Sequence, residues 1–185
     1  QKYGNLYVED VIPKSTYTFD DYNAMNGMEN YGGTANPPGH DSSYDTTRTV
    51  RGNVTGKTVF TDVNLPASTT WLMKLDIFGN VTKRQLTCCN EQTTTFTDTN
   101  GYALAETLTK GASGRPQVTT SPTYDFNTST TSTGTDPNSL VTTVNTRDAA
   151  LRPTLITYPT GATASATYND STPSESRSVS YDDSG

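Results

Sequence analysis

Cys88 and Cys89 are adjacent and are the only cysteines of the chain. A bond between them would close a small ring and stiffen a turn in an oxidising compartment. The alternatives are a reduced pair of small buried residues and a pair bonded to another chain. Zinc is not expected, because a zinc site uses separated pairs of ligands and more of them. The two residues by themselves leave the disulfide and the thiols open.

His40 is the only histidine, and Asp41, Ser42 and Ser43 follow it. A Ser–His–Asp relay needs a defined geometry that adjacency in sequence does not supply, so we expect a hydrogen bond that ties a loop. Carboxylate pairs could hydrolyse a glycoside only at a set separation in a cleft, and calcium would need an Asp-rich ligand loop that is absent. We therefore predict no catalytic, metal or cofactor site, and no enzyme.

A tyrosine–aspartate–glycine phrase recurs along the chain. Its clearest forms are residues 75–81, 97–102 and 181–185, and residues 147–153 are a divergent form. A short motif at intervals indicates a repeated supersecondary unit, and Asp and Gly form turns. The predicted turn positions are Asp76, Gly79, Asp98, Gly101, Asp148, Tyr158, Gly161, Tyr181, Asp182 and Gly185. The last phrase stops at Gly185, so we expect a segment of a longer polypeptide.

The composition favours strands with one solvated face. Apolar residues make up 31% of the chain, threonine is about a fifth of it, and there are 11 Tyr; Thr and Tyr suit a half-wet sheet surface. The net charge is −6, and no basic cluster indicates a nucleic-acid partner. No apolar stretch approaches the roughly 20 residues of a spanning helix, so membrane insertion is not expected.

The order of signals predicts an all-β chain of consecutive antiparallel hairpins with little or no helix. We expect an N-terminal strand pair in residues 1–19, a long Gly/Pro/Asp-rich loop in residues 20–48, and hairpin repeats in residues 49–185 with a Ser/Thr-rich loop near 119–134. Within the repeats, strands are expected at residues 57–63, 71–75, 93–97, 103–109, 140–144, 154–158, 162–168 and 177–181. Tyr158-Pro159-Thr160-Gly161 is a hairpin signal.

Taken together, these phrases resemble the YD-repeat, or RHS-repeat, proteins. The family phrase is Tyr-Asp, two variable residues, Gly, then Arg or Asn and an aliphatic residue, followed by a strand, a turn and another strand. Residues 148–170 follow that plan, although Leu151 replaces the expected Gly. Residues 40–55 and 76–90 are similar to runs in large bacterial RHS proteins. The resemblance covers roughly residues 40–185.

The resemblance implies hairpins laid side by side as an open, curved sheet, an arc of a shell. In full-length relatives such shells enclose a toxic C-terminal domain in bacterial polymorphic toxins and insecticidal complexes, or form a surface barrel in animal teneurins. It implies a secreted or cell-surface structural protein that builds a shell, fibre or scaffold, and it favours a vicinal disulfide between Cys88 and Cys89. An arc has open edges, so the expected partners are neighbouring repeats or copies of the chain.

A carbohydrate-binding or adhesive module is the alternative function, and an enzyme is a third. The aromatic content and the loop at residues 20–48 motivate the alternative, with Trp71 as the residue on which a sugar would stack. Glycans are therefore possible partners. Sequons place candidate glycosylation sites at Asn53, Asn80, Asn127 and Asn169.

Overall fold

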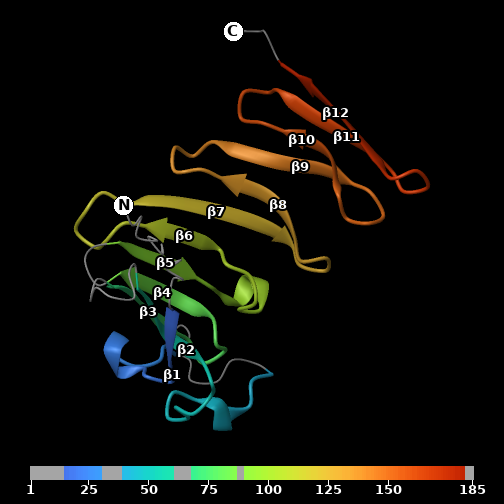
Figure 1. The fold of residues 1–185 in the computed structure, drawn as a ribbon. Helices are drawn as coiled ribbons and strands as arrows, with labels where there is room; N and C mark the ends of the chain where they lie inside the picture. The colour runs from blue at the N-terminus through green and yellow to red at the C-terminus, as the bar shows by residue number, and fades with distance from the viewer. Residues whose placement is uncertain (1–14, 31–38, 61–67, 87–89, 182–185) are drawn as a thin grey trace, which may run out of the picture. The chain divides into compact units, whose positions relative to one another are not determined.

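A computed structural model describes residues 15–30, 39–60, 68–86 and 90–181 (Figure 1). The chain is all-β, and within these residues the only helical elements are three 3-10 turns, η1 (Asn23–Met25), η2 (Ser42–Tyr44) and η3 (Asp98–Asn100). The strands are β1 (Ser15–Phe19), β2 (Val54–Phe60), β3 (Ser68–Leu75), β4 (Val81–Leu86), β5 (Glu91–Thr95), β6 (Thr107–Lys110), β7 (Val118–Asp125), β8 (Thr130–Thr135), β9 (Val141–Arg147), β10 (Pro153–Thr157), β11 (Thr163–Asn169) and β12 (Ser174–Ser180).

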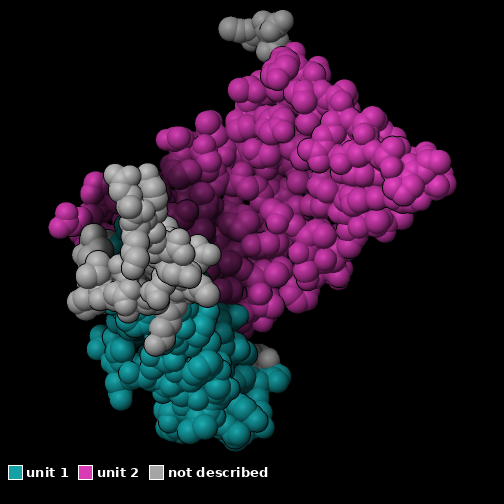
Figure 2. Space-filling model, in the orientation of Figure 1, with its two compact units in different colours: residues 1–91 teal, residues 92–185 magenta. Residues whose placement is uncertain are grey.

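The strand order in the sheet is the order in the sequence, from β1 to β12. The sheet is open and antiparallel, so the predicted architecture of consecutive hairpins is confirmed. The chain divides into two compact units, residues 1–91 and residues 92–185, coloured separately in Figure 2. Most pairings are local, because a hairpin joins strands that are close in sequence, but β1 pairs with β2 across residues 20–53.

The first unit has a small core over one face of its strands. Tyr22 and Met28 come from the segment that follows β1, and they pack with Leu75 and Ile77 at the end of β3. Ile77 is only 1% exposed. A parallel bridge between Glu29 and Asp76 fixes the segment, since Glu29 N–H donates to Leu75 C=O at 2.9 Å and Ile77 N–H donates to Glu29 C=O at 3.1 Å. The segment is thus hydrogen-bonded to the end of β3, and its side chains cover Leu75 and Ile77.

The second unit has no such covering segment among its described residues. Its only buried apolar residue there is Ala162, while Val118, Val141 and Val179 are exposed on their strands. Cross-strand pairs of hydroxyls bridge the strands instead; examples are Thr109 with Thr119 at 2.8 Å and Thr123 with Thr133 at 2.7 Å. Such directly opposed pairs are the local unit of sheet stabilisation.

The Ser/Thr-rich segment near residues 119–134 is not a loop, which corrects the expectation from sequence. It forms β7 and β8, joined by a tight connection. Pro122 is tolerated because β7 pairs with β6 only through residues 118–120 and with β8 through residues 121–125. A proline lacks an N–H to donate to a neighbouring strand, and Pro122 is paired with β8 but not with β6.

The N-terminal part of the chain is described from residue 15. Residues 1–14, with the first half of the expected strand pair, lie outside the described residues, and β1 pairs with β2. In residues 20–48 the described portions carry η1, η2 and the bridge at Glu29.

Candidate functional site

A five-residue turn led by aspartate joins β3 to β4. The Asp76 backbone N–H donates to Asn80 C=O at 3.0 Å, and the Gly79 N–H donates to Asp76 C=O at 3.0 Å. One carboxylate oxygen of Asp76 accepts the N–H groups of Phe78 and Asn80 at 2.8 and 2.9 Å. The other accepts the Asn80 side-chain amide at 3.0 Å. Gly79 has φ +88°, which glycine adopts without strain.

The same turn recurs at Asp148, between β9 and β10. Asp148 N–H donates to Arg152 C=O at 3.1 Å, and its Oδ1 accepts the N–H groups of Ala150 and Arg152 at 3.0 and 2.9 Å. The Arg152 guanidinium donates to the second carboxylate oxygen of Asp148 at 2.7 Å, as the Asn80 amide does to that of Asp76. The fourth position is Leu151 with φ +64°, so this copy keeps the left-handed backbone without the glycine.

Two further connections share this backbone. Asp136, between β8 and β9, repeats both backbone bonds and caps Asn138 and Leu140 with one carboxylate oxygen. Residues 158–162 close with Tyr158 N–H to Ala162 C=O at 2.8 Å and Gly161 N–H to Tyr158 C=O at 2.9 Å. The predicted Tyr158 and Gly161 turn is therefore the same backbone turn without an aspartate.

The predicted turn at Asp98 and Gly101 is built differently. It is the 3-10 turn η3, and its side-chain acceptor is the Thr97 hydroxyl, which takes the Thr99 N–H at 3.3 Å. Thr97 also bonds the Glu106 carboxylate. Tyr181 follows β12 with 77% of its surface exposed, while Asp182 and Gly185 lie outside the described residues.

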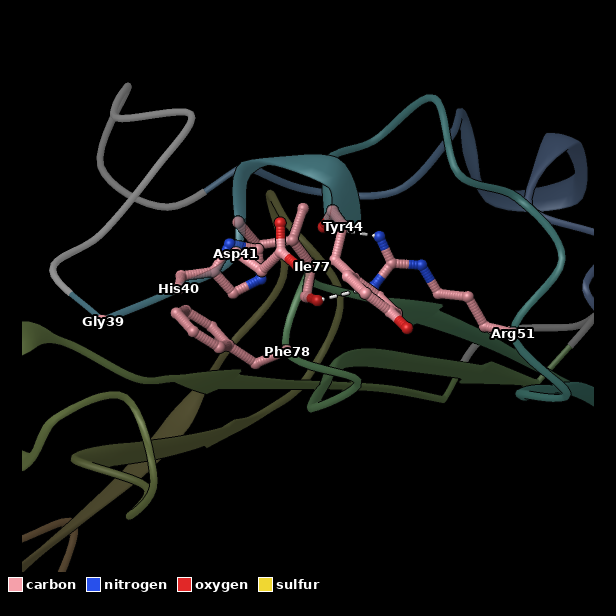
Figure 3. A pocket seen from close by; sticks show the side chains of 7 residues that line it. All are labelled: Gly39, His40, Asp41, Tyr44, Arg51, Ile77 and Phe78. Atoms are coloured by element: carbon pink, nitrogen blue, oxygen red, sulfur yellow. Dashed lines mark hydrogen bonds between the residues drawn. The ribbon is translucent and has the colours of Figure 1, made fainter.

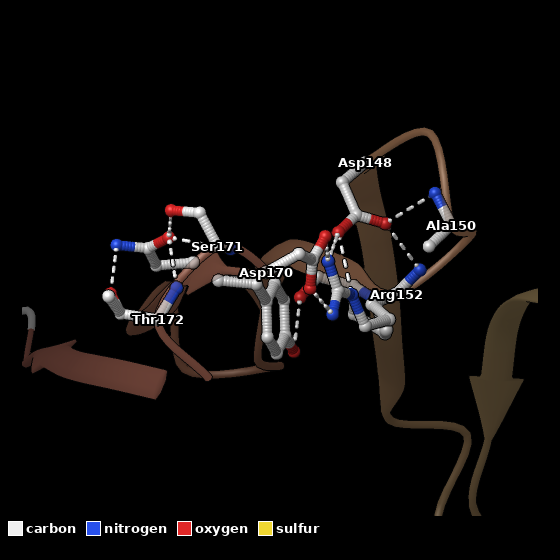
Figure 4. A network of polar contacts seen from close by, with 9 residues as sticks. Asp148, Ala150, Arg152, Asp170, Ser171 and Thr172 are labelled. Atoms are coloured by element: carbon white, nitrogen blue, oxygen red, sulfur yellow. Dashed lines mark hydrogen bonds and ion pairs between the residues drawn. The ribbon is translucent and has the colours of Figure 1, made fainter. Parts of the chain in front are cut away.

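Arg152 joins two neighbouring connections of the second unit (Figure 4). Its Nη1 and Nη2 donate to the two oxygens of Asp170 at 2.7 and 2.9 Å, a bidentate pair, while Nε donates to Asp148. The guanidinium also lies over the Tyr168 ring, 4.3 Å from its centroid. Arg152 holds the pKa of Asp148 and that of Asp170 below the ordinary value of an aspartate.

In the first unit, Asp20 holds residues 51–53 by hydrogen bonds, and we call this contact the Asp20 clamp. Its carboxylate accepts three consecutive backbone N–H groups, those of Arg51, Gly52 and Asn53, at 3.0, 2.8 and 2.9 Å. These bonds, that of Gly52 foremost, lower the pKa of Asp20. Sequence reasoning missed this role of Asp20, because residues 31 to 33 positions apart are joined only by the fold.

An open hollow of about 410 Å³ lies beside this clamp (Figure 3). Arg51 forms one wall and donates to the carbonyls of Arg48, Tyr44, Asp45 and Ile77 at 2.5 to 2.7 Å. The His40 ring meets the Phe78 ring edge-on, with centroids 4.9 Å apart. His40 Nδ1 is buried and has no hydrogen-bond partner among the described residues.

His40 and Asp41 both line the hollow. The Asp41 carboxylate accepts the Ser43 N–H at 2.9 Å and caps η2, and this bond lowers the pKa of Asp41. The loop-tying hydrogen bond predicted for His40 is thus made by Asp41. The guanidinium of Arg51 thus ties the loop at residues 44–48 to Ile77 through backbone carbonyls.

The other predicted residues are scattered over the two units. Trp71 is half-buried in β3, where its register partners are Lys57 and Leu86. Among the sequons, the Asn53 and Asn80 amides are bonded to Tyr22 and Asp76, and the Asn169 amide to Thr172. Asn127 is exposed in the β7–β8 connection. Cys88 and Cys89 lie outside the described residues.

In the part of the chain that the structure describes, no three His, Cys, Asp or Glu side chains gather as metal ligands. The described residues also include no helix long and apolar enough to cross a membrane. No protein-family model and no curated protein sequence matches the chain.

Proposed function

We propose that this chain is a structural β-repeat segment of the YD/RHS type, secreted or displayed at a cell surface, that builds a shell, fibre or scaffold by stacking strands edge to edge. One observation carries the proposal: successive strands pair in sequence order, and one five-residue turn recurs at residues 76–80, 136–140, 148–152 and 158–162. Such a design can be extended by adding hairpins, because each new strand needs only its predecessor.

The recurring chemistry of the turn supports the same proposal. The residue after the left-handed position is Asn80 in one copy and Arg152 in another. Each side chain donates a hydrogen bond to the second carboxylate oxygen of the leading aspartate. This gives a physical reason for the Arg-or-Asn choice in the family phrase that residues 76–80 and 148–152 resemble. Both residues offer an N–H donor to a carboxylate.

Strand β12 is where stacking would continue. All seven of its residues are exposed, and among the described residues it pairs only with β11. An edge strand presents N–H and C=O groups that invite another strand. The edge contains Arg177 and Glu175, which pair with each other, so no net charge repels an incoming strand.

Size-exclusion chromatography with light scattering, followed by negative-stain microscopy, tests the proposal on the full chain. We expect concentration-dependent dimers or filaments. Proline placed at Ser176 and, separately, at Arg177 provides matched variants, because N–H groups of consecutive residues in a strand point to opposite sides. One variant should retain the wild-type circular dichroism and lose association. A chain that stays monomeric at every concentration and is digested rapidly by protease would overturn the proposal.

A further inference from the structure

One face of the second unit carries a continuous row of hydroxyl side chains. Residues that pair directly across an antiparallel sheet share a face. Following the register from β7 to β12 gives a single line across six strands: Thr123, Thr133, Thr143, Thr157, Thr163 and Ser180. We call these residues the hydroxyl row.

The positions that flank the row on β11 and β12 extend it into a patch. Side chains alternate between faces along a strand, so the residues two and four positions away share its face: Ser165, Thr167, Ser178 and Ser176. The four are exposed. The opposite face carries an apolar line, Val144, Ile156, Ala164 and Val179, in the same registers. The two faces of this sheet therefore differ in chemistry.

The hydroxyls retain hydrogen-bonding capacity after the bonds that they already make, either with one another or, for Thr157, to the Asn145 side-chain oxygen at 2.7 Å. The hydroxyl oxygens of Thr123 and Thr133 are 2.7 Å apart, and those of Ser165 and Ser178 are 2.6 Å apart. A hydroxyl has one donor and two acceptor sites. A bonded pair consumes one donor and one acceptor, which leaves one donor and three acceptor sites for a partner. Each threonine also presents a methyl group.

The row is regular and carries no charge. Neighbouring strands lie about 4.8 Å apart, so six strands set the hydroxyls on a line of about 24 Å. The charged residues of β12, Glu175 and Arg177, stand opposite Tyr168 and Ala166 in the strand register and therefore lie on the other face of the sheet. An ionic partner therefore gains no ion pair from the row, whereas a neutral polymer with repeated hydroxyls meets donors, acceptors and methyl groups at even intervals.

We propose that the hydroxyl row binds an extended, uncharged polysaccharide, laid along the row across the strands. This binding uses a face of the sheet, so it goes beyond edge-to-edge stacking and does not require it. Single hydroxyl contacts are weak, because each exchanges with water. Six in line on one sheet act together, as linked sites do.

Retention of the full chain on microcrystalline cellulose, a neutral β-linked glucan, tests the proposal. The variant Thr143→Val/Thr157→Val/Thr163→Val removes three hydroxyls from the row while keeping shape and β-propensity. We expect its affinity to fall at least about tenfold, the loss that removal of several neutral hydrogen bonds brings. The control is Thr94→Val/Thr120→Val/Thr142→Val on the opposite face, which should bind like the wild type.

Circular dichroism and thermal melting of both triple variants establish that they are folded. Absence of wild-type retention, or an equal loss in the two triples, would overturn the proposal. So would binding abolished by moderate salt, since that marks an ionic contact. Ice shaping without cellulose retention would assign the row to ordered water instead. Failure of edge stacking leaves a monomer that still binds, so the two proposals fail separately.

Discussion

The two units hold similar strands together in different ways. In the first, the segment after β1 lies over β3 and buries Met28, Leu75 and Ile77. In the second, the described strands have no covering segment, and turns, cross-strand hydroxyl pairs and the Arg152 ion pairs hold them. The difference teaches that a repeat sheet needs a core at only part of its length, provided that each hairpin carries its own local bonds.

The largest expected effect is on the core of the first unit. Ile77→Ala removes a side chain that is 1% exposed, and it should lower the free energy of unfolding by about 4 kcal/mol. The matched change Ile156→Ala, at a half-buried position of the second unit, should lower it by about 1 kcal/mol. Urea unfolding measures both. Equal losses would show that the second unit has a core of its own.

Removal of the leading aspartate compares one copy of the turn from each unit. Asp76 is fully buried and accepts three hydrogen bonds, so Asp76→Ala should destabilise by about 3 kcal/mol. Asp148→Ala, in a solvated copy, should produce a clearly smaller drop in Tm. Thermal melts monitored by circular dichroism test the order. A larger drop for Asp148→Ala would contradict the contrast between a covered and a bare turn.

Acid should weaken the ion pairs that join the connections of the second unit. Arg152 lowers the folded-state pKa of both Asp148 and Asp170. A lowered pKa gives stability that is full above the unfolded value, about 3.9, and is lost as pH falls through the folded value. Hydrogen exchange of β11 and β12 should therefore be constant from pH 7 to about 5 after correction for intrinsic rates, and should accelerate below about 4.

Arg152→Met provides the control for this acid response, because it removes the partner of both carboxylates. Protection should then be lower at neutral pH and should change less between pH 5 and 3. An unchanged acid response would mean that other carboxylates cause it.

The smallest expected effect concerns the left-handed residue of the turn, and its sign differs between the units. Gly79→Ala places a side chain at φ +88° and should destabilise by about 1 kcal/mol. Leu151→Gly relieves about 1 kcal/mol of strain at φ +64° and loses about half of that to backbone entropy, a net gain of about 0.5 kcal/mol. Urea unfolding of the two variants compares the signs, and destabilisation by Leu151→Gly would show that its half-exposed side chain packs.

The strand pattern was predictable where apolar or β-branched residues cluster, as at β3 and β10. Prediction from sequence missed β4, whose central residues are Lys83 and Arg84. It also missed β7 and β8, where Pro122 and Gly134 are typical of loops. These strands are specified by their neighbours, because a strand inside a sheet gains its bonds from both sides. Likewise the clamp at Asp20 depends on residues more than 30 positions away.

The sequence by itself determined the order of hairpins and most of their turns, because the residues involved are four or five positions apart. Asp76 with Asn80, and Asp148 with Arg152, carry their partners within the motif. Tertiary structure alone decided which face each hydroxyl occupies and which strands receive a cover. Those outcomes depend on register, where a shift of one residue moves a side chain to the other face.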